Sequence, residues 1–173
     1  PARVASIRKV FSASRPAAAS LGQVHAATLH DGRPVVVKVQ RPNITKQIEQ
    51  DFAALEEIAR LLSRHTTMGR RYQLARILEE FENTIASELD YEREASNLLT
   101  LASNLKEFKD LRVPLPISNY STRKVLTMEY IEGKKITELS PLARMEINGA
   151  GLAEELFRGY LKQVLVDGIF HAD

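Results

Sequence analysis

A single lysine interrupts an otherwise apolar stretch, PVVVKVQ, at residues 34–40. β-Branched residues favour an extended backbone, and successive side chains of a strand point to opposite faces of its sheet. If Val37 and Val39 face the core, Lys38 faces either a cleft or solvent. A lysine in a cleft can hold an anionic group such as a phosphate, whereas a lysine in water is an ordinary surface residue. This stretch alone leaves both interpretations open, and the first of them requires a carboxylate partner.

The best source of such a carboxylate is ASELDYEREASN, residues 86–97, where acids stand at every second position. These acids are Glu88, Asp90, Glu92 and Glu94. In one continuous helix, which turns about 100° per residue, Glu88 would share a face with Glu92, and Asp90 would share another with Glu94. Both faces adjoin apolar positions, so we expect both pairs to lie close to surfaces that pack against another element. The alternative is a charged, solvated helix surface with Arg93 as local partner.

The stretch PAAAS, residues 16–20, stands directly before the lysine strand and its preceding strand. A loop over phosphates is usually rich in glycine, because glycine permits positive φ and close backbone approach. Alanine restricts both, although Ser20 and backbone N–H groups between Ala18 and Gly22 remain donors. The stretch alone favours a helix start after Pro16, and only its position favours a phosphate loop.

Two further segments have value mainly through their order in the chain. VLTMEYIEG, residues 125–133, is typical of a strand followed by a turn, and it is similar to the strand and linker that join the two lobes of a kinase. FHAD, residues 170–173, ends the chain with a histidine and an aspartate that are weak signals alone. Together, the segments give a lysine strand, an acidic helix, a linker and an aspartate after a long helix.

The surrounding pattern indicates the elements that position these residues. We expect a short helix at 4–11, strands at Gln23 to Leu29 and 34–40 with a turn at 30–32, and a helix at Ile44 to His65 that Asn43 can cap. Further expectations are one long helix from about Gln73 to Phe108, an extended segment at 113–121, a strand at 124–133, and a helix from about Pro141 to Asp167. This order is a mixed α+β pattern rather than the strict alternation of a doubly wound sheet.

Composition excludes several classes of protein. The 173 residues carry a net charge of +2 with acids and bases interspersed, so no nucleic-acid surface is indicated. There is no cysteine, hence no disulfide framework. No apolar run approaches the roughly 20 residues that span a bilayer. The chain starts with proline and stops at GIFHAD without a helix-stop signal, which favours a segment of a longer protein.

Together, PAAASLGQVH, VVVKVQRP, ELDYEREASN, VLTMEYIEG and FHAD resemble, in this order, the UbiB family of atypical protein-kinase-like proteins. Each motif is weak alone, but the ordered set is specific and covers about Phe11 to Asp173. The resemblance implies a protein-kinase-like N-lobe with inserted helices, at residues 1–133, followed by a hinge-following segment and the first helices of the C-lobe, at 134–173.

The resemblance also assigns roles to residues. In this family an alanine-rich loop replaces the glycine-rich one, which implies a restrained kinase activity. The nucleotide-binding loop would be Ala17, Ala18, Ala19 and Ser20, and Lys38 would contact phosphates with Glu94 as its helix partner. Met128 would border the base pocket, with the backbone of Glu129, Tyr130 and Ile131 at the adenine edge. Glu88 and Asp90 match a regulatory Glu-x-Asp motif, and Asp173 matches the catalytic-loop aspartate.

The expected function is therefore an atypical kinase or ATPase-like domain that binds ATP or ADP with Mg²⁺ and supports ubiquinone or other prenyl-lipid biosynthesis. The main Mg²⁺ ligands are expected beyond residue 173, which leaves the segment inactive alone. The alternative is a non-catalytic module that binds nucleotide or lipid and regulates a biosynthetic complex. Expected partners are a nucleotide, a prenyl lipid and ubiquinone-biosynthesis proteins, but no nucleic acid. The location would be the bacterial cytoplasm or membrane periphery, or the mitochondrion or plastid of a eukaryote.

Overall fold

The computed structural model describes residues 17–18, 21–65, 74–140 and 147–170. Its elements, in chain order, are β1 (Ala17–Ala18), β2 (Gly22–Thr28), β3 (Pro34–Gln40), α1 (Ile44–His65), α3 (Leu74–Glu88), α4 (Tyr91–Asn104), β4 (Val125–Glu129) and α6 (Gly149–Lys162). Short helical turns lie at Ser118–Tyr120 and Ile136–Glu138, and a π-helical turn at Gln163–Asp167 follows α6. The chain is thus an α+β fold, as expected. The short helix expected at 4–11 lies outside the described residues.

The four strands form one antiparallel sheet in the order β1-β2-β3-β4. β2 and β3 are joined by the expected hairpin, in which Gly32 adopts a φ of 89° and donates its N–H to the Leu29 carbonyl. Such a φ strains a residue with a side chain, so glycine suits this turn. The predicted strand at 34–40 is confirmed with the same bounds, and β2 begins and ends one residue earlier than expected.

The two faces of the sheet differ in character. One face carries the apolar cluster of Ala27, Leu29, Val35 and Val37, all of them buried. Lys38 points to the opposite face, since it lies between Val37 and Val39 and pairs across the sheet with Val24 and Leu126. The predicted orientation of the lysine is therefore confirmed. α4 contacts the sheet on the lysine side, through Tyr91 and Glu94.

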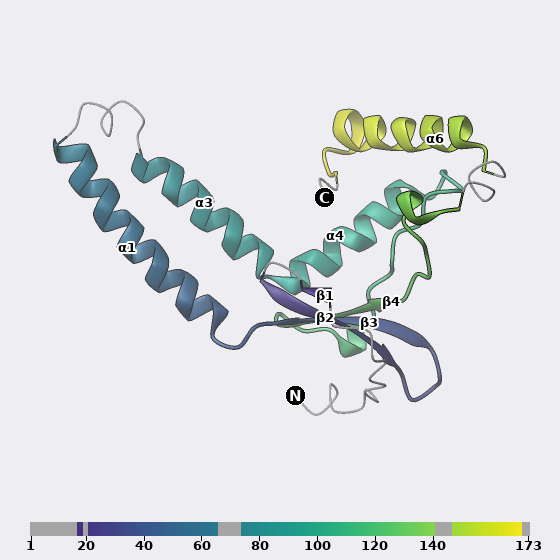
Figure 1. Ribbon diagram of the computed structural model, residues 1–173, viewed down its shortest axis with the longest axis horizontal. Coiled ribbons are helices and arrows are strands. Elements are labelled where there is room, and N and C mark those ends of the chain that lie inside the picture. Colours follow the sequence, from purple (N-terminus) through teal and green to yellow (C-terminus); the bar gives the residue numbers. More distant parts are fainter. Residues whose placement is uncertain (1–16, 19–20, 66–73, 141–146, 171–173) are drawn as a thin grey trace.

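α1 and α3 form an antiparallel pair that projects away from the sheet (Figure 1). Their rings Phe52 and Phe81 meet with centroids 5.6 Å apart. The Gln40 amide closes the base of the pair, because it donates to the Leu89 carbonyl and, at 3.2 Å, to the Arg123 carbonyl. The predicted helix at 44–65 is confirmed with the same bounds.

The single long helix expected from 73 to 108 is wrong, because the chain breaks at Leu89 and Asp90 into α3 and α4. Asp90 is not helical: its φ is −92° and its ψ is 89°, and its side chain accepts the N–H groups of Glu92 and Arg93. A carboxylate in this position caps a new helix. The two acidic faces derived from a continuous helix are therefore wrong as well.

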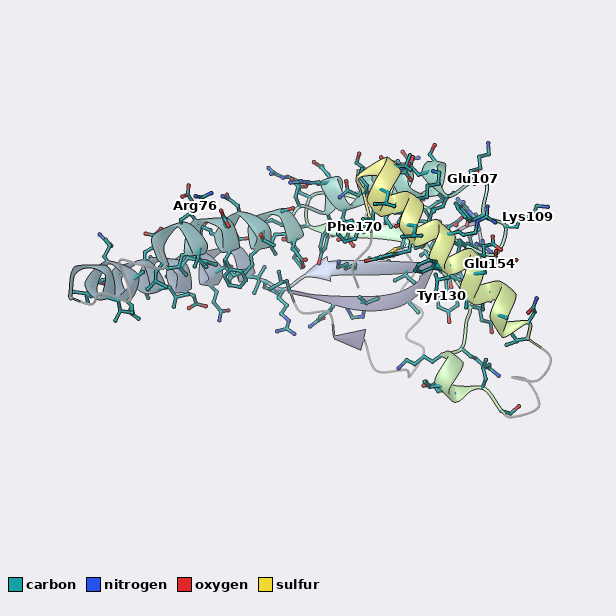
Figure 2. All side chains as sticks on the ribbon, turned by 90° about the horizontal axis from the view of Figure 1, so that it is seen from above. Arg76, Glu107, Lys109, Tyr130, Glu154 and Phe170 are labelled. Carbon is teal, nitrogen blue, oxygen red and sulfur yellow. The ribbon has the colours of Figure 1, made fainter. Side chains whose placement is uncertain are left out.

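α6 lies across the C-terminal end of α4, on the side away from the sheet (Figures 1 and 2). A side chain on Gly159 would collide with Leu111, so glycine permits this close packing. Lys162 fastens the same contact by donating to the Asn104 carbonyl at 2.8 Å. The helix expected from about Pro141 instead begins at Gly149, capped by the Asn148 side chain, and residues 141–146 lie outside the described residues.

Candidate functional site

Lys38 and Glu94 meet across the gap between β3 and α4. The Lys38 Nζ donates to both carboxylate oxygens of Glu94, at 2.9 Å and 2.8 Å. The two side chains are 23% and 33% exposed, so the pair is partly shielded from water. Partial burial strengthens an ion pair relative to one in bulk solvent. The structure thus brings together the two residues that the sequence analysis paired, 56 positions apart.

Tyr91 supplies a second partner to the same lysine. Its ring centroid lies 4.8 Å from the Lys38 Nζ, within the range of a cation–π contact. The tyrosine is 1% exposed, and burial, followed by the charges of Glu94 and Glu88, raises the pKa of its hydroxyl to about 12. The first turn of α4 therefore offers Lys38 both a carboxylate and an aromatic face.

Asp90 positions that first turn. Besides capping α4, its carboxylate lies 3.3 Å from the guanidinium of Arg123, which precedes β4. The N–H of Arg93 holds the pKa of Asp90 below its usual value, and Arg123 acts in the same direction. Glu88 is the last residue of α3 and is exposed. Of the predicted Glu-x-Asp pair, Asp90 thus has partners within this chain, while the regulatory role of both residues stays a prediction.

The residues expected at the adenine edge lie at the end of β4. Met128 is half-buried on the same face of the sheet as Lys38, since it pairs with Val36. The Glu129 backbone N–H donates to the Leu115 carbonyl at 3.0 Å, and its carboxylate accepts the Leu115 N–H at 3.3 Å. Tyr130 and Ile131 follow and are exposed, as Figure 2 shows for Tyr130. Their contact with a base stays a prediction.

The predicted loop and the catalytic-loop aspartate are described only in part. Ala17 and Ala18 form β1 and pair with Val24 and Gln23 of β2. Ala19, Ser20 and Asp173 lie outside the described residues. β1 therefore places the alanine-rich stretch against β2, one strand away from Lys38.

Tyr91, Arg123 and Gly22 were not singled out from the sequence, although the structure places all three at this site. Tyr91 precedes Glu94 by three residues, and this helical spacing could have indicated a shared face. Arg123 could not have been found in this way, because it meets Asp90 only through the fold. Gly22 stands at the start of β2, where a Cβ would lie 2.6 Å from the Tyr91 hydroxyl.

In the part of the chain that the structure describes, no group of three or more His, Cys, Asp or Glu is arranged to hold a metal ion. Across the same described ranges, no helix has both the length and the apolarity needed to cross a membrane.

Comparison with known proteins identifies the family. The model of the ABC1 atypical kinase-like domain matches residues 2–173. The chain is 40% identical over 172 residues to the Arabidopsis thaliana chloroplastic protein Activity of bc1 complex kinase 7, covering 99% of this chain and 25% of that protein. It is 37% identical over 172 residues to the probable protein kinase UbiB of Marinobacter nauticus, covering 99% of this chain and 31% of that protein.

A solved structure gives the same answer for the fold. The Mycobacterium tuberculosis protein Rv3197, determined in complex with erythromycin, matches with a TM-score of 0.61 and 28% identity, over 96% of this chain and 39% of that one. The chain thus spans about a quarter to two fifths of the length of these proteins. The expected resemblance to UbiB proteins and the kinase-like fold are both confirmed. The chain belongs to the family of ABC1 atypical kinase-like domains.

Proposed function

We propose that this domain binds a nucleotide through Lys38, held by Glu94, as part of an atypical kinase or ATPase. The observation that carries the proposal is the pair of hydrogen bonds that the Lys38 ammonium donates to the two carboxylate oxygens of Glu94, at 2.9 Å and 2.8 Å. An ammonium has three N–H donors, so these two bonds leave one donor for a ligand oxygen. Membership of a kinase-like family supports a phosphate as that ligand.

The site would act mainly by positioning and electrostatics. Lys38 would neutralise phosphate charge in the partly buried space beside β3, as the lysine of kinase folds does. Ala17, Ala18, Ala19 and Ser20 would lie over the phosphates. Met128 would border the base, with the backbone of Glu129, Tyr130 and Ile131 at its edge. Bound Mg²⁺ would supply charge neutralisation at the phosphates, and its main ligands are expected outside this sequence.

Asp173 would orient the attacking hydroxyl or accept its proton. The acceptor would be a small molecule, a lipid or a protein, or water if the activity is ATP hydrolysis. The UbiB name of the bacterial relatives supports a role in ubiquinone or related prenyl-lipid synthesis. Relatives named from bacteria and from a chloroplast support the proposed locations in the bacterial cytoplasm, at the membrane periphery or in plastids. Partner proteins would be those of the same biosynthesis.

Nucleotide titration of the full-length protein tests the proposal. Calorimetry should show MgATP or MgADP binding to the wild type and little or none to Lys38→Met, with Glu94→Gln in between. Lys124→Met is the matched control, because Lys124 is an exposed lysine directly before β4. This variant should bind nucleotide as the wild type does. Equal nucleotide affinity of the wild type and Lys38→Met would refute the role of Lys38.

The alanine-rich stretch favours a second candidate, a non-catalytic module that switches contacts on nucleotide binding. Alanine allows less positive φ than glycine and so restricts close approach of the backbone to the phosphates. Phosphate release from ATP, measured for the wild type and for Asp173→Asn, separates the candidates. Release that is lost in Asp173→Asn supports the enzyme. Nucleotide binding without release in either protein supports the module.

A further inference from the structure

The hydroxyl of Tyr91 is a buried polar group without a partner. Tyr91 is 1% exposed, and within the described residues its hydroxyl oxygen is closed to solvent and makes no hydrogen bond. Buried tyrosine hydroxyls usually have a partner, because an unsatisfied one loses its bonds to water without replacement. If only the packing of an apolar ring mattered here, phenylalanine would serve as well as tyrosine. The hydroxyl therefore needs an explanation beyond packing.

The hydroxyl lies against the backbone of Gly22. A Cβ at this glycine would stand 2.6 Å from the hydroxyl oxygen and 2.8 Å from the Val39 carbonyl oxygen, both too close for a real side chain. Gly22 is the first residue of β2 and directly follows the alanine-rich stretch. The hydroxyl is thus aimed at the point where the proposed phosphate loop enters the sheet.

The surroundings suit a negatively charged acceptor. The Lys38 ammonium lies 4.8 Å from the centre of the same ring, and Glu94 already takes two of its N–H groups. An anion drawn to the remaining donor of Lys38 would lie beside the tyrosine. Because burial raises the pKa of Tyr91 to about 12, its O–H stays protonated near neutral pH and remains a donor.

We propose that the Tyr91 hydroxyl is a phosphate-binding group, which donates a hydrogen bond to a phosphoryl oxygen of the nucleotide held by Lys38. This inference rests on the proposed nucleotide binding and deepens it. Since the Gly22 backbone covers the hydroxyl, the bond requires the chain at Gly22 to shift outward when the phosphate binds. Tyr91 would then connect three parts of the site: the loop end, the lysine strand and the first turn of α4.

The test compares Tyr91→Phe with the wild type in the full-length protein, by calorimetric titration and thermal unfolding. Without nucleotide, Tyr91→Phe should raise the Tm by about 2 °C or more, because it removes an unsatisfied buried group. MgATP and MgADP should bind about tenfold more weakly, since a hydrogen bond to a charged group is lost. Adenosine, which has no phosphate, should bind Tyr91→Phe as tightly as it binds the wild type. A purely structural tyrosine would not combine a higher Tm with weaker binding of ATP alone.

The outcomes separate this inference from the proposed function. Wild-type affinity of Tyr91→Phe for MgATP, with binding still abolished in Lys38→Met, would overturn the role of Tyr91 alone. An equal loss of ATP and adenosine affinity would also overturn it, because the effect would then not involve phosphate. If the wild type binds no nucleotide, the proposed function fails and this inference with it. Tyr120→Phe is the control, because Tyr120 packs on the opposite face of the sheet and should change neither affinity.

Discussion

Lys38 and Lys162 are partly buried lysines that pair with carboxylates, and they differ in how many N–H donors they leave free. Lys38 bonds to Glu94 and, among the described residues, makes no further hydrogen bond. Lys162 contacts the Asn104 carbonyl at 2.8 Å, the Asp167 carboxylate at 3.1 Å and Glu107 at 3.7 Å. Their exposures are nearly equal, at 23% and 27%.

Partial burial and an ion pair are thus common to both lysines. The two differ in the number of acceptors that they contact. An ammonium has three N–H donors. Lys162 contacts three acceptor oxygens of its own chain, whereas Lys38 contacts the two oxygens of Glu94. We expect the first lysine to serve mainly binding and the second mainly stability, and substitutions can test that division.

The largest expected effect is that of Lys38→Met on nucleotide affinity. Loss of a charge-assisted contact with phosphate should weaken MgATP binding by about 100-fold, with a small change in Tm. Isothermal titration and a thermal melt of the same sample measure both quantities. A large fall in Tm with unchanged affinity would make Lys38 a structural residue and abolish the distinction.

Lys162→Met should show the reverse. It leaves Asp167, which is 11% exposed, without its cation and removes the bond between α6 and the end of α4. Breaking a largely buried pair from one side should cost about 2 kcal/mol of unfolding free energy. Urea unfolding measures this cost, and a control at the exposed Lys109→Met should be close to wild type. A tenfold loss of MgATP affinity in Lys162→Met, under conditions where it is fully folded, would contradict the division.

Asp90→Ala sharpens the comparison by loosening the helix that carries Glu94 to Lys38. Loss of the cap should lower the Tm by about 3 °C and weaken MgATP binding about twofold, whereas Asp90→Asn should retain most of the cap. Because the pKa of Asp90 is lowered in the folded protein, its charge stabilises the fold above the unfolded pKa of 3.8. That contribution is lost as the pH falls below about 4. A melt series from pH 6 to pH 3 in which Asp90→Asn loses as much stability as the wild type would contradict this role.

The smallest expected effect is that of Glu88→Gln. Glu88 is the last residue of α3, where a negative charge opposes the helix dipole, so its removal should stabilise the protein by about 0.3 kcal/mol. Its effect on nucleotide affinity should be negligible. A clear loss of nucleotide affinity in Glu88→Gln, measured on folded protein, would instead make Glu88 part of the site.

Local pattern was sufficient for the hairpin of β2 and β3 and for the direction of Lys38. Alternation in PVVVKVQ and the glycine turn at Gly32 are encoded by neighbouring residues, and both are confirmed. The break between α3 and α4 was not recognised, because neither glycine nor proline marks it. Asp90 begins α4 by capping it, yet within an acidic run its carboxylate looked like one charge among four.

The partners of Lys38 show the same limit. Glu94 could be proposed because a lysine in a cleft needs a carboxylate partner and because the order of the motifs resembles that of the UbiB family. Tyr91 and its contact with Gly22 depend on how closely α4 packs on the sheet, which no local pattern contains. Arg123 reaches Asp90 from 33 positions away and likewise requires the fold.

The Gln40 amide has a consequence for how this domain can vary. By bonding the Leu89 carbonyl it joins the two ends of the α1–α3 pair at the sheet, next to the strand of Lys38 and the helix of Glu94. The pair is thus an insertion whose entry and exit are fixed at one point. We expect that whole helical turns can be added to or removed from α1 and α3 together while the separation of Lys38 and Glu94 is preserved. Changes in the length of this helix pair should therefore leave the candidate site unaltered.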